Sequence, residues 1–420
     1  MQLEILNTGS ELMLGRVLNT HQQWLCRRLA DMGYEVARQV AVPDTGPAIQ
    51  RAVCDALGRA DFIICTGGLG PTSDDLTRDL IAELLGRKLK EDKAIVAHIE
   101  QFFLQRQRPM PASTRVQAMV PEGARVLPNA RGTAPGLAME VSPNPFRAEG
   151  KTSWLVMLPG PPREMHPMFR EQVVPLLREK FPLDAVFVCR TLRSTGLGES
   201  VVQEKIEPAL KHLTGLEIGY CARTGEVDVR LVARGGGADQ TVAEAERIVQ
   251  SLIGRHVFGT DDESLESAVV RLLAEQRSTL TLAESCTGGY IGHRITNVPG
   301  ASAVLLAGLV TYSNDAKQKF LGVRTETLSG HGAVSEAVVR EMAEGAIAAT
   351  GADYALAVTG IAGPGGGSPE KPVGTVFLGL AGKGPTLSLR RSNAFDRETF
   401  KFITSQQALE MLRRRLLKAE

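Results

Sequence analysis

The stretch Leu282–Gly292, "LAESCTGGYIG", joins an apolar segment to two consecutive glycines. The segment before it, "STLTLAES", is typical of a buried strand, and the residues after the glycines can start a helix. Strand, glycine turn and helix in succession form the repeating unit of layered α/β folds. Glu284, Ser285 and Cys286 at this turn leave two interpretations open. The turn either uses small residues for its geometry alone or forms a loop that holds a nucleophile.

The same unit recurs on both sides of this stretch. A new helix begins at about Asp261 with "TDDESLESAVVRLLAEQ". The segment "SEAVVREMAEGAIAATG" predicts a helix that Ser335 caps and Gly351 ends. An apolar strand and glycine loop, "YALAVTGIAGPGGG", follow, and "DRETFKFITSQQALEMLRRRLLK" predicts a closing helix. Residues 261–420 are therefore expected to form one α/β domain.

Residues 1–173 alternate strand and helix signals in the same way, which predicts a mostly parallel, layered α/β sheet. One unit is "DFIICTGGLGPTSDD", a buried strand that opens into a glycine loop, and "TSWLVMLPGPPREMHPMF" repeats the device. The pattern changes over residues 174–260, which predict a small α+β unit. Its period-two stretch "EVDVRLVAR", Glu226–Arg234, predicts a strand with one solvent-exposed face. The predicted fold is thus two layered α/β domains joined by a small α+β domain.

Composition excludes several classes of function. The net charge is +1 and aromatic residues make up 5%, so we expect no direct binding of nucleic acid. The longest apolar run, "ASAVLLAGLVTY", is shorter than the roughly 20 residues that span a bilayer, and the first residues carry no signal-peptide pattern. Six cysteines without a CxxC pair are typical of free thiols in a reducing compartment. We therefore expect a cytoplasmic protein without a membrane partner.

In the C-terminal domain, three loops that follow strands are predicted to form a functional site: "ESCTGG", "TYSNDAK" and "TGIAGPGGG". Parallel α/β sheets bind ligands at these strand ends. A serine nucleophile such as Ser285 needs a base, and Lys317 can serve if it is desolvated. Tyr312 could relay a proton or fix the lysine. Two alternatives stay open: Cys286 as nucleophile with Glu284 and Lys317, or a surface lysine beside a half-buried tyrosine without any role.

Chemistry in the N-terminal domain is predicted for "TGGLGPTSDD", Thr66–Asp75. Amides exposed among the glycines can hold a pyrophosphate. Asp74 and Asp75 can bind a metal ion through oxygen, although acids at a helix start also act as simple caps. The loop is not a dinucleotide fingerprint, because Ser73 occupies the third glycine position.

Long motifs in the C-terminal domain, "TLAESCTGGYIGHRITNVPGASAVLLAGLVTYSNDAKQKFLGV", "GAVSEAVVREMA" and "LAVTGIAGPGGGSPEKPVGTV", resemble the CinA family. The resemblance covers residues 262–420. It implies a nicotinamide mononucleotide deamidase without a cofactor at this site. Ser285 would be the nucleophile, with Tyr312 and Lys317 as its catalytic partners. The substrate-binding residues that it implies are Glu284, Thr287, Gly288, Gly289, Thr359, Gly360 and Arg397.

Motifs in the N-terminal domain, "NTGSELMLGRVLNT", "TGGLGPTSDDLTRD", "RGTAPGLAM" and "LPGPPREMHPMF", resemble the molybdopterin-binding fold of CinA proteins. This implies an ADP-ribose pyrophosphatase with a divalent metal ion on Asp74 and Asp75. One difference is Asn19–His21, "NTH", where that fold usually has "DTN". The nucleotide-binding residues implied are Glu11, Asp44, Gly67, Gly68, Gly70, Thr72, Gly132, Pro159 and Gly160.

The middle unit resembles the KH-like linker domain of the same family, with "STGLGES" nearest to a GxxG loop. Together the resemblances imply a bifunctional hydrolase of pyridine-nucleotide salvage, whose ligands are nicotinamide mononucleotide and ADP-ribose and which forms a homodimer. Two other functions remain as alternatives. One is a molybdopterin-binding or molybdopterin-processing protein, and the other is a competence or DNA-damage factor associated with nucleic acid.

Overall fold

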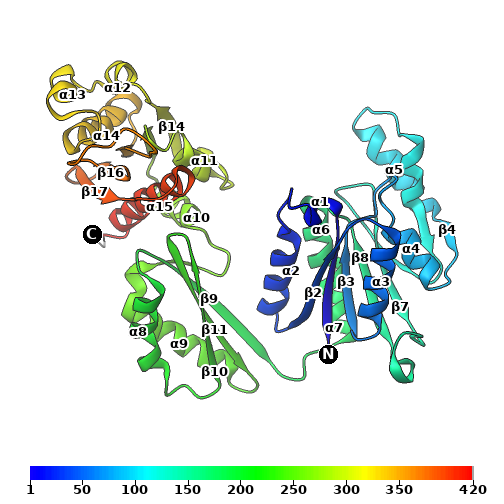
Figure 1. Ribbon diagram of the computed structural model, residues 1–420. Helices are drawn as coiled ribbons and strands as arrows, with labels where there is room; N and C mark the ends of the chain where they lie inside the picture. The colour runs from blue at the N-terminus through cyan, green and yellow to red at the C-terminus, as the bar shows by residue number, and fades with distance from the viewer. Residues whose placement is uncertain (419–420) are drawn as a thin grey trace. The chain divides into compact units, whose positions relative to one another are not determined.

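The computed structural model describes residues 1–418, which form two compact units, Met1–Phe187 and a second unit that starts at Val188. Figure 1 shows an α/β sandwich in the first unit and two sheets with their helices in the second. The elements of the first unit are β1 (Leu3–Thr8), α1 (Ser10–Met13), α2 (Thr20–Asp31), β2 (Val36–Val42), α3 (Gly46–Leu57), β3 (Phe62–Thr66), α4 (Thr77–Leu84), β4 (Leu89–Glu91), α5 (Lys93–Gln105), the 3-10 helix η1 (Ala112–Ala118), β5 (Met119–Pro121), β6 (Arg125–Leu127), β7 (Gly136–Val141), η2 (Ala148–Gly150), β8 (Ser153–Leu158), α6 (Pro162–Met168), the π-helical turn η3 (Phe169–Val173) and α7 (Val174–Lys180).

The main sheet of the first unit has the strand order β2-β1-β3-β8-β7-β6. The first four strands are parallel, and β7 and β6 are antiparallel additions. Successive side chains of a strand point to opposite faces, so each face has its own core. Helices α2, α6 and α7 pack on one face, where Leu25 and Met165 are buried, and α3 and α4 cover the other through Ile49 and Ile81. This is the layered α/β sheet that the alternating pattern predicts.

The expected domain boundary at residue 173 falls inside a run of helix. Helix α6, η3 and α7 follow one another without a break from Pro162 to Lys180. Leu176 and Leu177 of α7 are buried in the core of the first unit. The first unit therefore extends to Phe187, because the apolar face of α7 belongs to its core and not to the middle domain.

The second unit begins with the middle domain and continues into the C-terminal domain. Its elements are β9 (Phe187–Thr195), α8 (Glu199–Leu210), β10 (Leu216–Arg223), β11 (Glu226–Arg234), α9 (Ala238–Ile253), η4 (Gly254–His256), β12 (Val257–Thr260), α10 (Leu265–Glu275), β13 (Leu280–Glu284), α11 (Tyr290–Thr296), η5 (Ala301–Ala303), β14 (Leu305–Val310), α12 (Asn314–Leu321), α13 (Thr325–His331), α14 (Glu336–Thr350), β15 (Tyr354–Gly360), β16 (Thr375–Gly382), β17 (Leu387–Ser392) and α15 (Arg397–Leu416).

The middle domain is a four-stranded sheet, β10-β11-β9-β12, on which α8 and α9 pack. Strand β11 is present, but the prediction that one of its faces is exposed is wrong. Glu226 and Asp228 are each only 8% exposed. Arg193 forms ion pairs with both carboxylates, and Gln406 of α15 donates a hydrogen bond to Glu226. Paired charges can be buried where unpaired ones cannot, so polar residues here line a domain contact instead of a solvent-exposed face.

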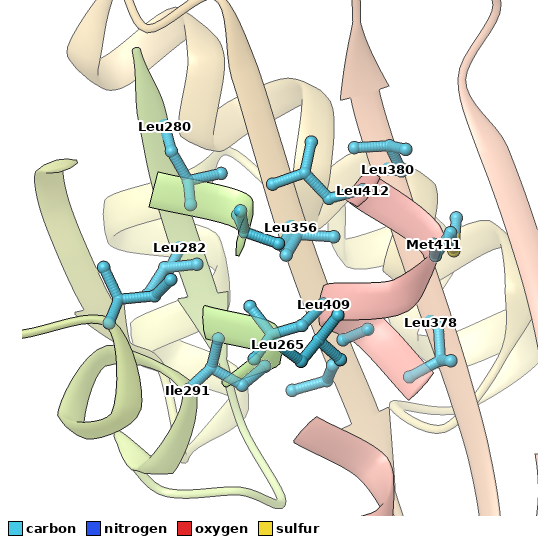
Figure 2. Packing of buried hydrophobic residues seen from close by; sticks show 14 of the residues in the cluster. Leu265, Leu280, Leu282, Ile291, Leu356, Leu378, Leu380, Leu409, Met411 and Leu412 are labelled. Carbon is cyan, nitrogen blue, oxygen red and sulfur yellow. The ribbon is translucent and has the colours of Figure 1, made fainter. Parts of the chain in front are cut away.

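The C-terminal sheet has the order β14-β13-β15-β16-β17, with the first three strands parallel. One face is lined by leucines, such as Leu282 and Leu356, which pack against α10, α11 and α15 (Figure 2). The other face carries small residues, and a Cβ added at Gly379 would lie 2.7 Å from the Val339 carbonyl oxygen of α14. Helix α14 therefore approaches this face closely. Ser335 caps α14 and Gly351 ends it, as predicted.

Candidate active sites

The ends of β13 and β14 bring Ser285 and Lys317 together. Ser313 accepts a hydrogen bond from the Ala316 amide and so starts α12, which places Lys317 in the first turn of that helix. The lysine Nζ lies 3.1 Å from Ser285 Oγ, 2.8 Å from the Thr311 carbonyl oxygen and 3.4 Å from the Tyr312 carbonyl oxygen. Its side chain is only 1% exposed. A buried serine–lysine pair of this kind is suited to nucleophilic chemistry.

The surroundings of Lys317 favour its neutral form. Burial lowers the pKa of Lys317, and nearby Cys286 opposes this effect more weakly. A neutral amine has two N–H groups and one lone pair. The carbonyl oxygens of Thr311 and Tyr312 can accept hydrogen bonds from these two N–H groups. The lone pair is then left for the hydroxyl proton of Ser285. The backbone contacts thus hold Lys317 in an orientation that would suit a general base. The carbonyl of Tyr312, and not its phenol, makes the contact with Lys317.

The alternative with Cys286 as nucleophile has little support from the geometry. Cys286 is buried among core residues, and burial raises the pKa of its thiol to about 12. The thiolate is the reactive form, so this thiol is inert near neutral pH. Glu284, the second member of that alternative, is fully occupied by other hydrogen bonds. Ser285 is therefore the better candidate for the nucleophile.

Glu284 holds the loop in place. Its carboxylate accepts hydrogen bonds from Thr287 Oγ1 at 2.6 Å and from three backbone amides, those of Gly289 at 3.0 Å, Ile291 at 3.1 Å and Gly292 at 2.8 Å. The buried carboxylate thus occupies the unpaired amides at the start of α11. These amides are not available to a ligand, and Glu284 and Thr287 stabilise the loop through these hydrogen bonds.

A supporting role for Glu284 predicts a loss of stability when it is replaced. Glu284→Gln keeps the size of the side chain but puts an amide NH₂ where one oxygen accepts a hydrogen bond. We expect the free energy of unfolding to fall by about 1–3 kcal/mol, the usual cost of a buried unsatisfied donor, measured by urea denaturation. Glu344→Gln, an exposed change on α14, is the control. Unchanged stability with lost activity would instead show that Glu284 contacts the substrate.

Tyr312 and Arg397 form the outer rim of this site. Arg397, the first residue of α15, donates to the Tyr312 hydroxyl at 2.6 Å and to the Gly363 carbonyl oxygen at 3.0 Å. Tyr312 is 59% exposed and Arg397 is also exposed, so the pair faces solvent. Asp396 caps the helix by accepting from the Glu398 and Thr399 amides, which fixes where α15 begins. A guanidinium presented in this way can bind an anionic group.

The remaining residues predicted for this site shape the backbone. The Thr359 hydroxyl is buried and donates to the Ala333 carbonyl oxygen at 2.8 Å, so it ties β15 to the turn before α14. A Cβ at Gly360 would lie 2.9 Å from the Thr375 carbonyl oxygen, so glycine permits the close approach of β16. Gly288 and Gly289 have positive φ angles of 61° and 93°, which glycine adopts most readily.

The second candidate site is a cavity of about 570 Å³ at the strand ends of the first unit. Of the residues predicted for this site, most line the cavity: Glu11, Asp44, Gly67, Gly68, Gly70, Asp74, Asp75, Pro159 and Gly160. Thr72 and Gly132 take supporting positions. The Thr72 amide and hydroxyl donate to Asp75, and a Cβ at Gly132 would overlap Glu164. The cavity size is in the range of small-molecule sites.

Acidic side chains dominate this cavity. Five carboxylates line it, those of Glu11, Asp44, Asp74, Asp75 and Glu164, and none of its described lining residues is Lys or Arg. Asp44 is held by the Ser10 amide at 2.7 Å. His21 also lines the cavity, and burial lowers the pKa of its imidazole. The imidazole therefore adds little positive charge at neutral pH, and an anionic ligand would need a cation to accompany it.

Whether this cavity can bind a metal ion depends on the oxygen atoms that a bound ligand adds to its coordination. Among residues 1–418, no group of three His, Cys, Asp or Glu side chains is arranged to hold a metal. Asp75 already accepts two hydrogen bonds from Thr72, whereas Asp74 is exposed. Mg²⁺ usually keeps several waters and binds through one or two carboxylates together with substrate phosphates. The acidic cavity suits that mode of binding and not a cage made by protein side chains alone.

Glu164 and Gln117 are two polar residues among those of the cavity that sequence reasoning missed. Glu164 lies in the quoted motif "LPGPPREMHPMF" but was not singled out, and Asn129 donates to its buried carboxylate at 2.9 Å. Gln117 lies in η1, outside every quoted motif. Only the fold shows that η1 borders the glycine loops, so no signal in the sequence would have selected Gln117.

Comparison with known proteins identifies the family of this chain. A family model described as the CinA C-terminal domain matches residues 262–416. A "CinA-like protein" of Akkermansia muciniphila is 45% identical over 410 residues, which cover 97% of this chain and 96% of that protein. A second "CinA-like protein", from Kosmotoga olearia, is 41% identical over 420 residues and 99% of both chains. The chain belongs to the CinA family.

The other two domains of this CinA-family chain match as well. Residues 4–179 match the family described as "Probable molybdopterin binding domain", and residues 189–259 match the "Damage-inducible protein CinA KH domain". The competence/damage-inducible protein CihA of Agrobacterium tumefaciens, a solved structure, is 45% identical, with a TM-score of 0.35, and covers 35% of this chain and 91% of its own. In the described part of the CinA-family chain, no helix is long and apolar enough to cross a membrane.

Proposed function

We propose that this CinA-family chain is a hydrolase with two sites, and that its C-terminal domain deamidates nicotinamide mononucleotide. The observation that carries the proposal is the buried contact of 3.1 Å between Lys317 Nζ and Ser285 Oγ. A desolvated lysine beside a serine is a nucleophile and its base without any cofactor. The exposed Arg397 guanidinium at the rim is suited to the 5′-phosphate of the mononucleotide.

The proposed reaction has two steps, acylation of Ser285 and hydrolysis of the acyl-serine. Ser285 Oγ attacks the carboxamide carbon while its proton passes to Lys317 Nζ. The resulting ammonium donates a proton to the amide nitrogen, and the C–N bond breaks. Ammonia departs, and the acyl group stays on Ser285 as an ester. Water then attacks the acyl carbon, its proton passes to Lys317, and Ser285 Oγ departs and regains a proton. Since Glu284 occupies the amides of Gly289, Ile291 and Gly292, those of Cys286 and Thr287 are the candidates for the oxyanion hole.

The direct test is to incubate the purified chain with nicotinamide mononucleotide and to measure ammonia and the acid product. Nicotinamide riboside, which lacks the phosphate, should react with a much higher KM if Arg397 binds that group. Absence of ammonia with a folded protein would refute the proposed activity.

The state of Lys317 predicts how deamidation depends on pH. Only the neutral amine can accept the Ser285 proton, so kcat/KM should rise with pH and level off above the pKa of Lys317. Burial places that pKa below its ordinary value of 10.5, so the plateau should begin below that value. The measurement is kcat/KM across pH with nicotinamide mononucleotide. If Lys317→Arg showed the same rise of kcat/KM over the same pH range, the rise would come from the titration of another group.

For the N-terminal domain we propose metal-dependent cleavage of the ADP-ribose pyrophosphate. Glycine amides at Gly67–Gly70 are suited to phosphate, and the five carboxylates favour a ligand that arrives with a divalent cation. When bound, the cation would neutralise phosphate charge, and Asp74 is the residue best placed to hold it. The matched family description favours molybdopterin as a second candidate ligand. The two candidates predict different results. A pyrophosphatase releases AMP from ADP-ribose, whereas a molybdopterin-binding protein retains a pterin without turnover.

A further inference from the structure

Lys401 of α15 holds its ammonium over the loop that carries Ser285. A Cβ built on Gly288 would lie 4.0 Å from Lys401 Nζ and would meet no other atom within that distance, apart from its neighbours in the chain. Gly288 is exposed, and its amide donates to the Ser285 carbonyl oxygen at 3.1 Å, so it lies one turn after Ser285. The ammonium therefore faces open space beside this loop.

This ammonium has no partner of opposite charge. Lys401 is half-buried, and among residues 1–418 its Nζ atom forms neither an ion pair nor a hydrogen bond. It lies 5.7 Å from the centroid of the Tyr290 ring, at the start of α11. A charge that is partly removed from water and lacks a counter-ion is unfavourable. A bound anion would compensate this cost.

Helix α15 presents two cations to the predicted site. Arg397 and Lys401 are four residues apart, so they lie on one face of the helix. Arg397 donates to the Tyr312 hydroxyl and to the Gly363 carbonyl oxygen. Lys401 reaches the loop of Gly288. Each of the three loops that follow strands in this domain is thus approached by one of the two cations.

The position of Lys401 suits the far end of a mononucleotide. A turn closed by a hydrogen bond between residues three apart keeps its end Cα atoms within about 7 Å. Lys401 therefore lies a short way beyond Ser285, where a ligand that reacts at its carboxamide would place its phosphate. A phosphate monoester carries close to two negative charges at neutral pH, so two cations neutralise it better than Arg397 alone. Lysine binds phosphate as a mobile point charge.

We propose that Lys401 is a specificity-determining residue that binds, together with Arg397, the 5′-phosphate of the mononucleotide at the Ser285 site. The inference rests on the proposed deamidation, and it names the residue that makes this site prefer a nucleotide to a nucleoside. Loss of the ammonium should weaken only ligands that carry the phosphate.

The test compares nicotinamide mononucleotide with nicotinamide riboside, which lacks the phosphate. Ammonia release is measured for the full chain, for Lys401→Met, for Lys401→Arg and for Lys319→Met, an exposed control on α12. Lys401→Met should raise KM for the mononucleotide by roughly 10-fold, the lower end for a hydrogen bond between charged groups, with little change in kcat. Its kcat/KM for the riboside should stay within about two-fold, since no phosphate is lost. Lys401→Arg keeps the charge and should restore most of the affinity, and Lys319→Met should affect neither substrate.

Binding is measured separately, by calorimetry of both probes with the Ser285→Ala chain, in which neither should be consumed. Tighter binding of the mononucleotide that Lys401→Met removes would uphold the inference, and absence of ammonia in that case would refute only the deamidase. Ammonia release with a KM that Lys401→Met leaves unchanged would overturn the inference and leave the deamidase standing. An equal loss with both probes would also overturn it, because Lys401 would then only support the loop. Failure to bind the mononucleotide at all would do the same.

Discussion

Ser285→Ala is expected to lower kcat for deamidation of nicotinamide mononucleotide by roughly three orders of magnitude or more, with little change in KM. The serine hydroxyl forms a covalent bond only as the reaction proceeds, so its loss acts on the transition state. Lys317→Met, which keeps the volume of this buried side chain, should cost about as much because Ser285 then has no base. Combining the two changes should cost little beyond either one, since both residues act as one unit. Ammonia release measures each variant.

Cys286→Ala is the matched control for this prediction. Cys286 is the neighbour of Ser285 and is buried, and burial raises the pKa of its thiol to about 12, so we expect it to take no part in the reaction. The variant should retain most of the activity, and iodoacetamide should not inactivate the intact enzyme. A fully active Ser285→Ala together with an inactive Cys286→Ala would assign the reaction to cysteine.

Local patterns in the sequence were sufficient for much of the fold. Ser335 and Gly351 delimit α14 as predicted, because caps depend on the residue itself and its nearest neighbours. The loops at Ser285 and Lys317 meet because their strands are parallel neighbours, which alternating strands and helices predict. Where an element's environment comes from distant residues, prediction fails. The exposed face expected for β11 is buried because Arg193 and Gln406 approach it from other elements.

The same distinction applies to the candidate sites. Ser285, Lys317, Tyr312 and Arg397 are brought together by the fold. The sequence could not show that Glu284 binds backbone amides of its own loop, because a carboxylate beside a serine is equally typical of a catalytic group. In the same way, a phenol close to a lysine in sequence can point away from it. The Tyr312 hydroxyl accepts a hydrogen bond from Arg397, 85 residues further along the chain.

Asp74→Asn is expected to reduce cleavage of ADP-ribose by roughly 100-fold or more, because charge stabilisation by a metal ion is worth several kcal/mol. Asp74 is exposed in the cavity, and asparagine keeps an oxygen that can accept the hydrogen bond from the Thr72 side chain, so this replacement should not disturb the loop. Asp75 is less informative, since its loss would also release the Thr72 amide and hydroxyl. Asp55→Asn, an exposed change on α3 outside the cavity, is the control. Release of AMP at several Mg²⁺ concentrations measures the effect.

Deamidation should be unaffected by Asp74→Asn, and a chelator should abolish only the cleavage of ADP-ribose. The reason is that the proposed mechanism of Ser285 and Lys317 uses no metal, whereas the acidic N-terminal cavity should repel a pyrophosphate that arrives without a cation. Higher Mg²⁺ should restore part of the activity of Asp74→Asn, because a weakened cation site can still be filled by mass action. If Asp74→Asn instead lowered both activities in a folded protein, the two reactions would share one site and the proposed division of labour would be wrong.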